Sequence, residues 1–205
     1  MGFGILFLGY IFTVFDTGTL FIDSISSVFM QGFRLLGWLL VAVGSIKLSR
    51  YIKKFSYART AAIFIFSVSL SLTVHHILKV YFNFAIHIAV GTGLLMLYAI
   101  GYFIFHFYAL CGLSDITAEV GLEKENKRSK TLFVITMLFC AVNLAAYTGI
   151  SEQVSSLRYI LFFIVTVLNS YHIYTCYMWI CLPKDKELDD GKEAKEKKEN
   201  GKNKK

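Results

Sequence analysis

Long stretches of the chain contain no charged side chain, and this feature constrains the fold more than any other. They include Val80–Leu113, Leu132–Ser151, Met1–Phe15 and Ala61–Thr73. A membrane-spanning helix needs about 20 apolar residues to cross about 30 Å of hydrocarbon. A soluble core of this size would not need such runs. With 56% hydrophobic residues and one proline in 205, the sequence predicts an all-α, polytopic membrane protein.

The charge-free stretches predict one domain, a bundle of six transmembrane helices over residues 1–182. The spans are expected at about 2–22, 28–47, 60–80, 84–112, 131–150 and 159–182. The first is the weakest, because its apolar part up to Phe15 covers only about 14 residues, or about 21 Å. It must therefore continue past Asp16 or be re-entrant. Residues 183–205 contain many lysines and several acidic residues but almost no apolar side chain. This composition predicts a disordered, charged cytoplasmic tail.

Basic residues lie on alternate loops and predict the orientation. They follow the second span, follow the fourth span and fill the tail: Lys47, Arg50, Lys53, Lys54, Arg59, Lys124, Lys127, Arg128 and Lys130, with the tail lysines. By the positive-inside rule both termini are cytoplasmic, in the plasma or inner membrane. These residues account for the net charge of +7 without nucleic acid. The expected partners are the lipid bilayer and anionic headgroups on the cytoplasmic face, and a homo-oligomer or membrane partner is compatible with the sequence.

The connection between the fourth and fifth spans allows two interpretations. Ser114 or Asp115 is a suitable helix cap, and Leu113, Ile116 and Val120 recur at helical spacing before a glycine. One interpretation is a short helix on the inner membrane surface followed by a charged connector. The other is a continuation of the fourth span into the cytosol.

Polar residues inside apolar spans predict which helices face the interior, because such groups are costly in lipid. The third span carries serines and threonine on two faces, which predicts a central position in the bundle. In the fifth span, Ala141, Ala145 and Gly149 form a small-residue face suited to close helix contact. Asn143 of the fifth span and His172 of the sixth are predicted at similar depth, and Asn169 shares a stripe with His172. They form either a substrate- or proton-binding centre or an interhelical hydrogen bond, and we favour the hydrogen bond.

Two charges are predicted near the outer ends of the first two spans. Asp16 and Arg34 both come to roughly 9 Å of depth. Facing each other, they would form an ion pair and lower each other's cost of insertion. Alternatively, the Arg34 side chain reaches headgroups or water without a partner.

Three histidines, His75, His76 and His87, lie near the outer turn between the third and fourth spans. They are candidates for a metal site, with acids from neighbouring turns, or for proton-linked transport. Their spacing matches no recognised ligand motif, and His75 and His76 point about 100° apart on a helix. We therefore favour structural or interfacial histidines, and no cofactor is expected.

Catalytic signatures are missing from the sequence, which has no H-E-x-x-H, G-x-S-x-G or phosphate-loop pattern. The sequence therefore predicts a non-enzymatic structural, sensory or accessory membrane component. The alternative is a small-solute or ion transporter, proton- or metal-linked, that uses the buried polar residues of the third, fifth and sixth spans. A water-filled cavity that reaches Asn143 or His172 would favour the transporter, and a packed interior would favour the first class.

Overall fold

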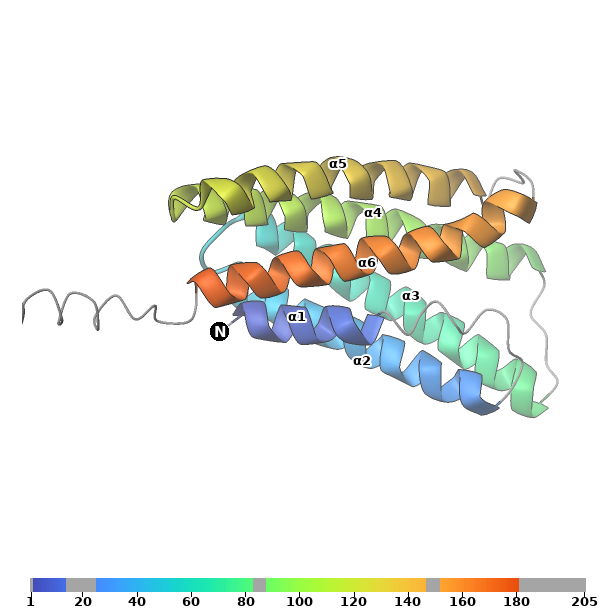
Figure 1. Cartoon of the computed structure of the whole chain (residues 1–205). Helices are drawn as coiled ribbons and strands as arrows, with labels where there is room; N and C mark the ends of the chain where they lie inside the picture. Colours follow the sequence, from blue (N-terminus) through green and yellow to red (C-terminus); the bar gives the residue numbers. More distant parts are fainter. Residues whose placement is uncertain (1, 14–24, 83–87, 147–151, 181–205) are drawn as a thin grey trace, which may run out of the picture.

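Six α-helices run side by side in the computed structural model, which describes residues 2–13, 25–82, 88–146 and 152–180 (Figure 1). They are α1 (Gly2–Thr13), α2 (Ile25–Leu48), α3 (Lys54–Phe82), α4 (Ile88–Glu119), α5 (Glu123–Ala146) and α6 (Glu152–Ile180). Five of them contain segments long and apolar enough to cross a membrane: Val28–Leu48, Lys54–Phe82, Ala89–Glu119, Glu123–Ala145 and Ile160–Ile180. These five confirm the predicted all-helical, multi-pass class.

The first helix is shorter than the span expected at 2–22. α1 has 12 residues, or about 18 Å of helix, against about 30 Å of hydrocarbon. The rest of the expected span, including Asp16, lies outside the described residues.

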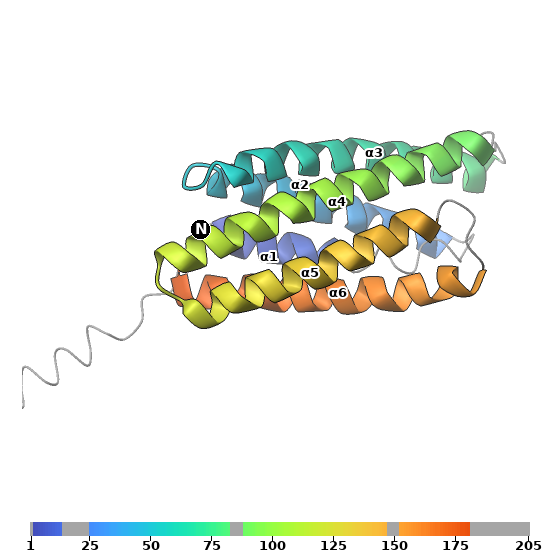
Figure 2. The same ribbon diagram turned by 90° about the horizontal axis from the view of Figure 1, so that it is seen from above.

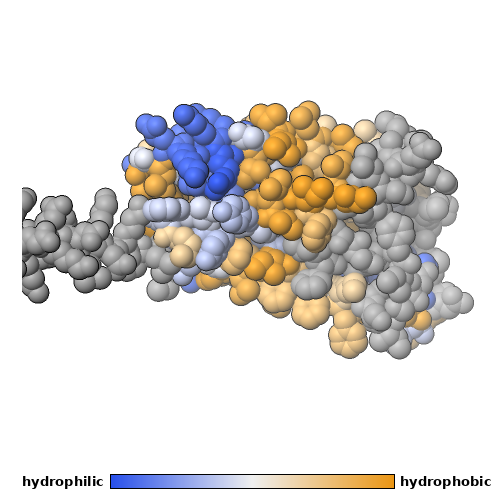
Figure 3. Space-filling view, in the orientation of Figure 1, coloured by the Kyte–Doolittle hydropathy of each residue, from blue (hydrophilic) through white to orange (hydrophobic). Residues whose placement is uncertain are grey.

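The helices form a closed ring in chain order. Each packs against its neighbours in sequence, and α6 returns to pack against α1 (Figures 1 and 2). One end of the bundle, which we call the basal end, carries Gly2, the connections 49–53 and 120–122, and Ile180. Figure 3 shows hydrophilic side chains gathered at this end of the visible face and mostly hydrophobic ones over the rest of the coloured surface.

Aromatic rings fill the interior of the ring of helices. Trp38 of α2 donates a hydrogen bond from Nε1 to the hydroxyl of Tyr98, at 3.0 Å, and its ring packs edge-on against Phe105 with centroids 5.5 Å apart. Across the bundle, the hydroxyl of Tyr10 lies 2.7 Å from Nε2 of His106. All of these side chains are buried. Because three of them belong to α4, that helix supplies most of the aromatic centre.

The expectation that the third span is central is wrong. α3 packs against α2 and α4 at the side of the bundle. The hydroxyls of Ser67 and Ser71 donate to carbonyl oxygens one turn back in the same helix, at 3.0 and 3.2 Å, on an exposed face. Such local hydrogen bonds satisfy the hydroxyls without a neighbouring helix. Polar residues on two faces therefore did not require a central position.

Glycines bring α1 and α2 into backbone contact. A Cβ atom on Gly9 would lie 2.7 Å from the backbone nitrogen of Val41, and one on Gly37 would lie 2.9 Å from the oxygen of Gly9. Gly44 approaches the backbone of Leu6 in the same way. Small residues permit such close helix packing in membranes, and here they attach the short α1 firmly to α2.

The described part of the small-residue face expected on the fifth span does not form a close helix contact. Ala141 is exposed and Ala145 is partly exposed, while Gly149 lies outside the described residues. The close helix contact that the sequence predicted for the fifth span is formed instead by α1 and α2.

α4 continues past residue 112, the expected end of the fourth span, to Glu119, and Gly121 follows its last turn. The amide of Leu122 donates to the carbonyl of Thr117 at 2.8 Å, and that of Gly121, with φ +75°, donates to Ala118 at 3.1 Å. This pair of bonds is the Schellman motif, which favours glycine at the left-handed position. Of the two interpretations of the 113–130 connection, continuation of the fourth span is correct. α5 then begins at Glu123, eight residues before the expected start of its span.

Candidate functional site

A cluster of polar side chains lies between α5 and α6 near the basal end. The first turns of α5 run antiparallel to the last third of α6 (Figure 2). Glu123 and Glu125 occupy the first turn of α5, where negative charge complements the helix dipole. The cluster, which we call the α5–α6 polar cluster, consists of Glu125, Arg128, Ser129, His172 and Cys176.

An ion pair closes the cluster toward the basal surface. Nη1 of Arg128 donates to both carboxylate oxygens of Glu125, at 3.0 and 2.9 Å. The Glu125 side chain is 6% exposed and that of Arg128 is 31% exposed. The guanidinium carbon also lies 5.4 Å from the ring centre of Tyr171 on α6, within the range of cation–π attraction. Arg128 therefore neutralises a buried carboxylate and contacts the neighbouring helix.

His172 lies at the centre of the cluster and is fully buried. Its Nε2 is 2.7 Å from the hydroxyl oxygen of Ser129 on α5 and 3.8 Å from the sulfur of Cys176 one turn along α6. Its Nδ1 is 3.3 Å from Oε2 of Glu125, although the two are not aligned as a hydrogen bond. A carboxylate, an imidazole and a hydroxyl are thus arranged in sequence across the α5–α6 interface.

Carboxylate, imidazole and hydroxyl groups in this order can activate a nucleophile, but the burial of these three groups points to a different role. A catalytic hydroxyl must meet the reacting atom of a substrate. The side chains of Ser129 and His172 are both 0% exposed, and Ser129 lies within a continuous helix. The arrangement can join α5 to α6 and can share a proton between buried groups.

A further interhelical hydrogen bond lies farther from the basal end, one turn away along α6 and two turns away along α5. Nδ2 of Asn169 donates to the hydroxyl oxygen of Thr136 at 3.1 Å, and both side chains are buried. The predicted contact between Asn143 and His172 is wrong, because His172 contacts Ser129 instead. Asn143 is buried, but it lies 14 residues beyond Ser129 on α5, or about 21 Å along the helix.

The buried positions on α5 form one stripe. It runs from the fifth span, expected at residues 131–150, back into residues 123–130, which the sequence assigned to a charged connector. These positions are Glu125, Ser129, Leu132, Thr136, Phe139, Cys140 and Asn143. Steps of three and four residues place these side chains on one helical face. Sequence reasoning missed Glu125, Arg128 and Ser129 because it assigned them to a charged loop. Extending the stripe backward from Asn143 would have found Glu125 and Ser129.

Arg34 is buried between α2, α3 and α4, with 3% of its surface exposed. Its Nη2 lies 3.5 Å from the carbonyl oxygen of Ser69 and from the hydroxyl of Thr73. Its guanidinium carbon is 5.8 Å from the ring centre of Tyr98. Such burial does not fit a side chain that extends into water. The proposed partner, Asp16, lies outside the described residues, so the ion pair stays a prediction.

The sequence proposed His75, His76 and His87 as candidates for a metal site. His75 and His76 lie on α3 and are partly buried, and His87 lies outside the described residues. Among the residues that the structure describes, no group of three His, Cys, Asp or Glu side chains is arranged to hold a metal ion.

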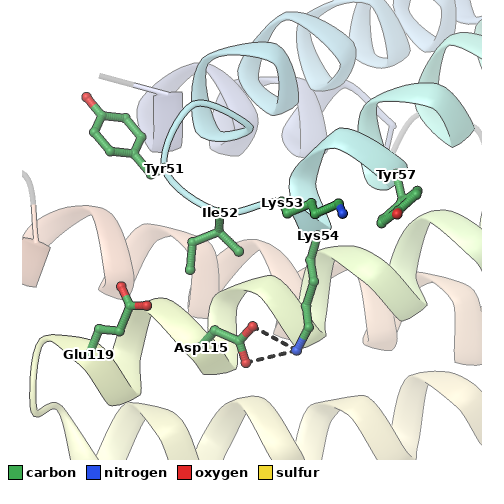
Figure 4. A pocket seen from close by; sticks show the side chains of 7 residues that line it. All are labelled: Tyr51, Ile52, Lys53, Lys54, Tyr57, Asp115 and Glu119. Atoms are coloured by element: carbon green, nitrogen blue, oxygen red, sulfur yellow. Dashed lines mark hydrogen bonds and ion pairs between the residues drawn. The ribbon is translucent and has the colours of Figure 1, made fainter.

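A second polar feature at the basal end joins α3 to α4. Nζ of Lys54 lies 2.7 Å from the Asp115 carboxylate, beside a cavity of about 390 Å³ (Figure 4). Both side chains are about 40% exposed, at 43% and 40%. An ion pair this exposed contributes less than about 1 kcal/mol to stability. The pair of Lys54 and Asp115 is therefore expected to contribute less to stability than the buried pair of Glu125 and Arg128.

Comparison of the chain with protein-family models, curated proteins and solved structures found no match.

Proposed function

We propose that this protein is a non-enzymatic component of the plasma or inner membrane, of structural, sensory or accessory type. One observation carries the proposal: the interior of the bundle is filled by packed aromatic side chains. Tyr10, Trp38, Tyr102, Phe105 and His106 come from three helices and are all at most 3% exposed. A carrier needs a wet binding site near the membrane midplane, and this packing favours a protein that acts through its surfaces.

The proposed orientation places the basal end in the cytoplasm, with both termini on that side. The connections 49–53 and 120–122 lie at this end, as do the first turns of α5. They carry or adjoin Arg50, Lys53, Lys54, Lys124, Lys127 and Arg128. The positive-inside rule assigns such an end to the cytoplasm. The charged surface at this end would then face cytosolic signals or partners.

The alternative function, a small-solute or ion transporter, has less support from the polar residues on which it relied. Ser67 and Ser71 of α3 bond to their own helix. On α5 and α6, Ser129 and Thr136 bond to His172 and Asn169. The hydrogen bonds between α5 and α6 are those expected of a structural role, because each polar group reduces the cost of burying its neighbour.

A native thiol provides the test. Cys140 of α5 is 1% exposed and free. In a protein with the other cysteines changed to serine, a small thiosulfonate reagent should leave Cys140 unmodified in membranes until denaturant is added. Tyr51→Cys in the same background, at a position 78% exposed, is the matched control and should react at once. Rapid labelling of Cys140 in native membranes would instead establish a wet interior and favour the transporter.

A further inference from the structure

Two hollows on the outer face of α6 meet at one residue, Tyr171. The first is a polar pocket of about 450 Å³, between the start of α5 and the α6 residues Tyr171, Thr175 and Trp179. The second is an apolar groove of about 460 Å³ between α1 and α6. Phe7 and Phe163 lie on its opposite sides, and Tyr171 lines it too. The two hollows therefore share the side chain of Tyr171, and charged residues line the first but not the second.

The groove reaches farther from the basal end along α6 than the pocket does. The pocket runs from Trp179 to Tyr171, and the groove runs from Tyr174 to Phe163, so the two overlap for one turn. Tyr174 to Phe163 is 11 residues, or about 16 Å of helix. This length matches one leaflet, half of about 30 Å of hydrocarbon. The exposed Trp179 occupies the level at which tryptophan is enriched, the membrane–water interface.

The polar pocket offers groups that recognise a phosphate diester. Lys124 and Arg128 line it at four-residue spacing on α5, so their side chains are neighbours. Arg128 uses Nη1 to bind Glu125, and its planar guanidinium has further donors suited to phosphate oxygens. The amino-terminal end of α5 adds the positive end of a helix dipole. Glu123 also lines the pocket and can accept a hydrogen bond from a headgroup hydroxyl or ammonium.

We propose that this composite hollow is a binding site for one membrane glycerophospholipid. The phosphate lies between Lys124 and Arg128, the glycerol region lies beside Tyr171 and Trp179, and one acyl chain occupies the groove between α1 and α6. Neither hollow alone selects this ligand. Their shared residue Tyr171, the farther reach of the groove from the basal end and the change from charged to apolar lining together fit an amphiphile that carries a phosphate.

The test uses the full-length protein, delipidated in a mild detergent and then given a mixture of phosphatidylglycerol and phosphatidylethanolamine. Native mass spectrometry should detect one retained phospholipid per chain. Lys124→Glu should lower its retention by about tenfold or more, because a basic residue near the membrane attracts lipid phosphate and the reversed charge repels it. Lys130→Glu, on the same helix and exposed but outside the pocket, should leave retention unchanged.

A second pair of variants tests the groove. Val167→Trp should fill the groove and reduce retention, whereas Leu168→Trp should not, because Leu168 is comparably exposed but does not line the groove. Retention that is the same in all four variants would overturn the proposal and indicate unspecific annular lipid. Equal competition by soluble glycerol phosphate would also overturn it, since the site would then recognise free phosphate. So would a stable dimer that Val167→Trp abolishes, because a second copy would then occupy the groove.

Discussion

The hydroxyl oxygen of Ser129 lies 2.7 Å from Nε2 of His172, and both side chains are fully buried between α5 and α6. This contact fixes how far the two helices are displaced along each other. It also brings His172 beside the carboxylate of Glu125, 3.3 Å away. The start of α5 is thereby joined to the last third of α6 through polar contacts.

Ser129→Ala should destabilise the protein by about 1–2 kcal/mol, because it leaves a buried imidazole nitrogen without its hydroxyl partner. Thr131→Ala is the matched control. The Thr131 hydroxyl is exposed and donates to Lys127 of its own helix, so its loss should cost less than about 0.5 kcal/mol. Unfolding in mixed micelles with increasing denaturing detergent measures both values. Equal losses in the two variants would contradict the structural role of the Ser129 contact.

Removing Arg128 should cost more than removing the pair. Arg128→Gln leaves the 6%-exposed carboxylate of Glu125 without its cation, and we expect a loss of about 2–3 kcal/mol, with a milder loss in the double variant that adds Glu125→Gln. The exposed pair of Lys54 and Asp115 is the control. Lys54→Gln should cost less than about 1 kcal/mol. The same unfolding assay applies, and strictly additive losses for Glu125 and Arg128 would show that the pair is not coupled.

Two glycines of α2 should respond to alanine in opposite ways. Gly37→Ala places a Cβ 2.9 Å from backbone atoms of α1, so α1 must move, at a cost of about 1–3 kcal/mol. Gly32→Ala meets nothing within 4 Å and should be neutral or stabilising by up to about 1 kcal/mol, since alanine favours the helix. Thermal unfolding in detergent compares them. A Gly37→Ala protein as stable as Gly32→Ala would mean that α1 and α2 are not in backbone contact.

Arg34 and Asp16 should behave as a coupled pair. Arg34 is almost fully buried, and a buried guanidinium is stabilised most by a carboxylate. In a double-mutant cycle with Arg34→Gln and Asp16→Asn, the double variant should lose less stability than the sum of the two single losses. Stability in detergent is the measurement. Additive effects would assign the neutralisation of Arg34 to another group.

Absence of charge predicted five of the helices well, because the cost of charge in lipid acts on each segment separately. It placed the start of α5 wrongly, since six of the eight residues from Glu123 to Lys130 are charged. Those six are also good helix formers, and the acids lie at the amino-terminal turn, where they complement the helix dipole. That error displaced the predicted partner of His172 from Ser129 to Asn143. The relative position of two helices depends on packing across the interface, which no single segment encodes.

The contact of α1 with α2 could not be predicted from the sequence either. Gly9, Gly37 and Gly44 could be seen in the sequence, but glycines also occur at exposed helical positions such as Gly32. Only the structure distinguishes a glycine in backbone contact from one that faces open space. The same limit explains α3, where serine hydroxyls bonded to their own backbone had the appearance of interior polar groups.

The proposed cytoplasmic placement of the basal end is tested most directly by labelling at two tyrosine positions. Tyr51 lies at the basal end and is 78% exposed, while Tyr81 lies at the opposite end of α3 and is 56% exposed. Each is changed to cysteine in a protein whose native cysteines are replaced by serine. In intact cells, a membrane-impermeant maleimide should label Tyr81→Cys and should label Tyr51→Cys only after lysis. Labelling of Tyr51→Cys but not of Tyr81→Cys in intact cells would contradict the account.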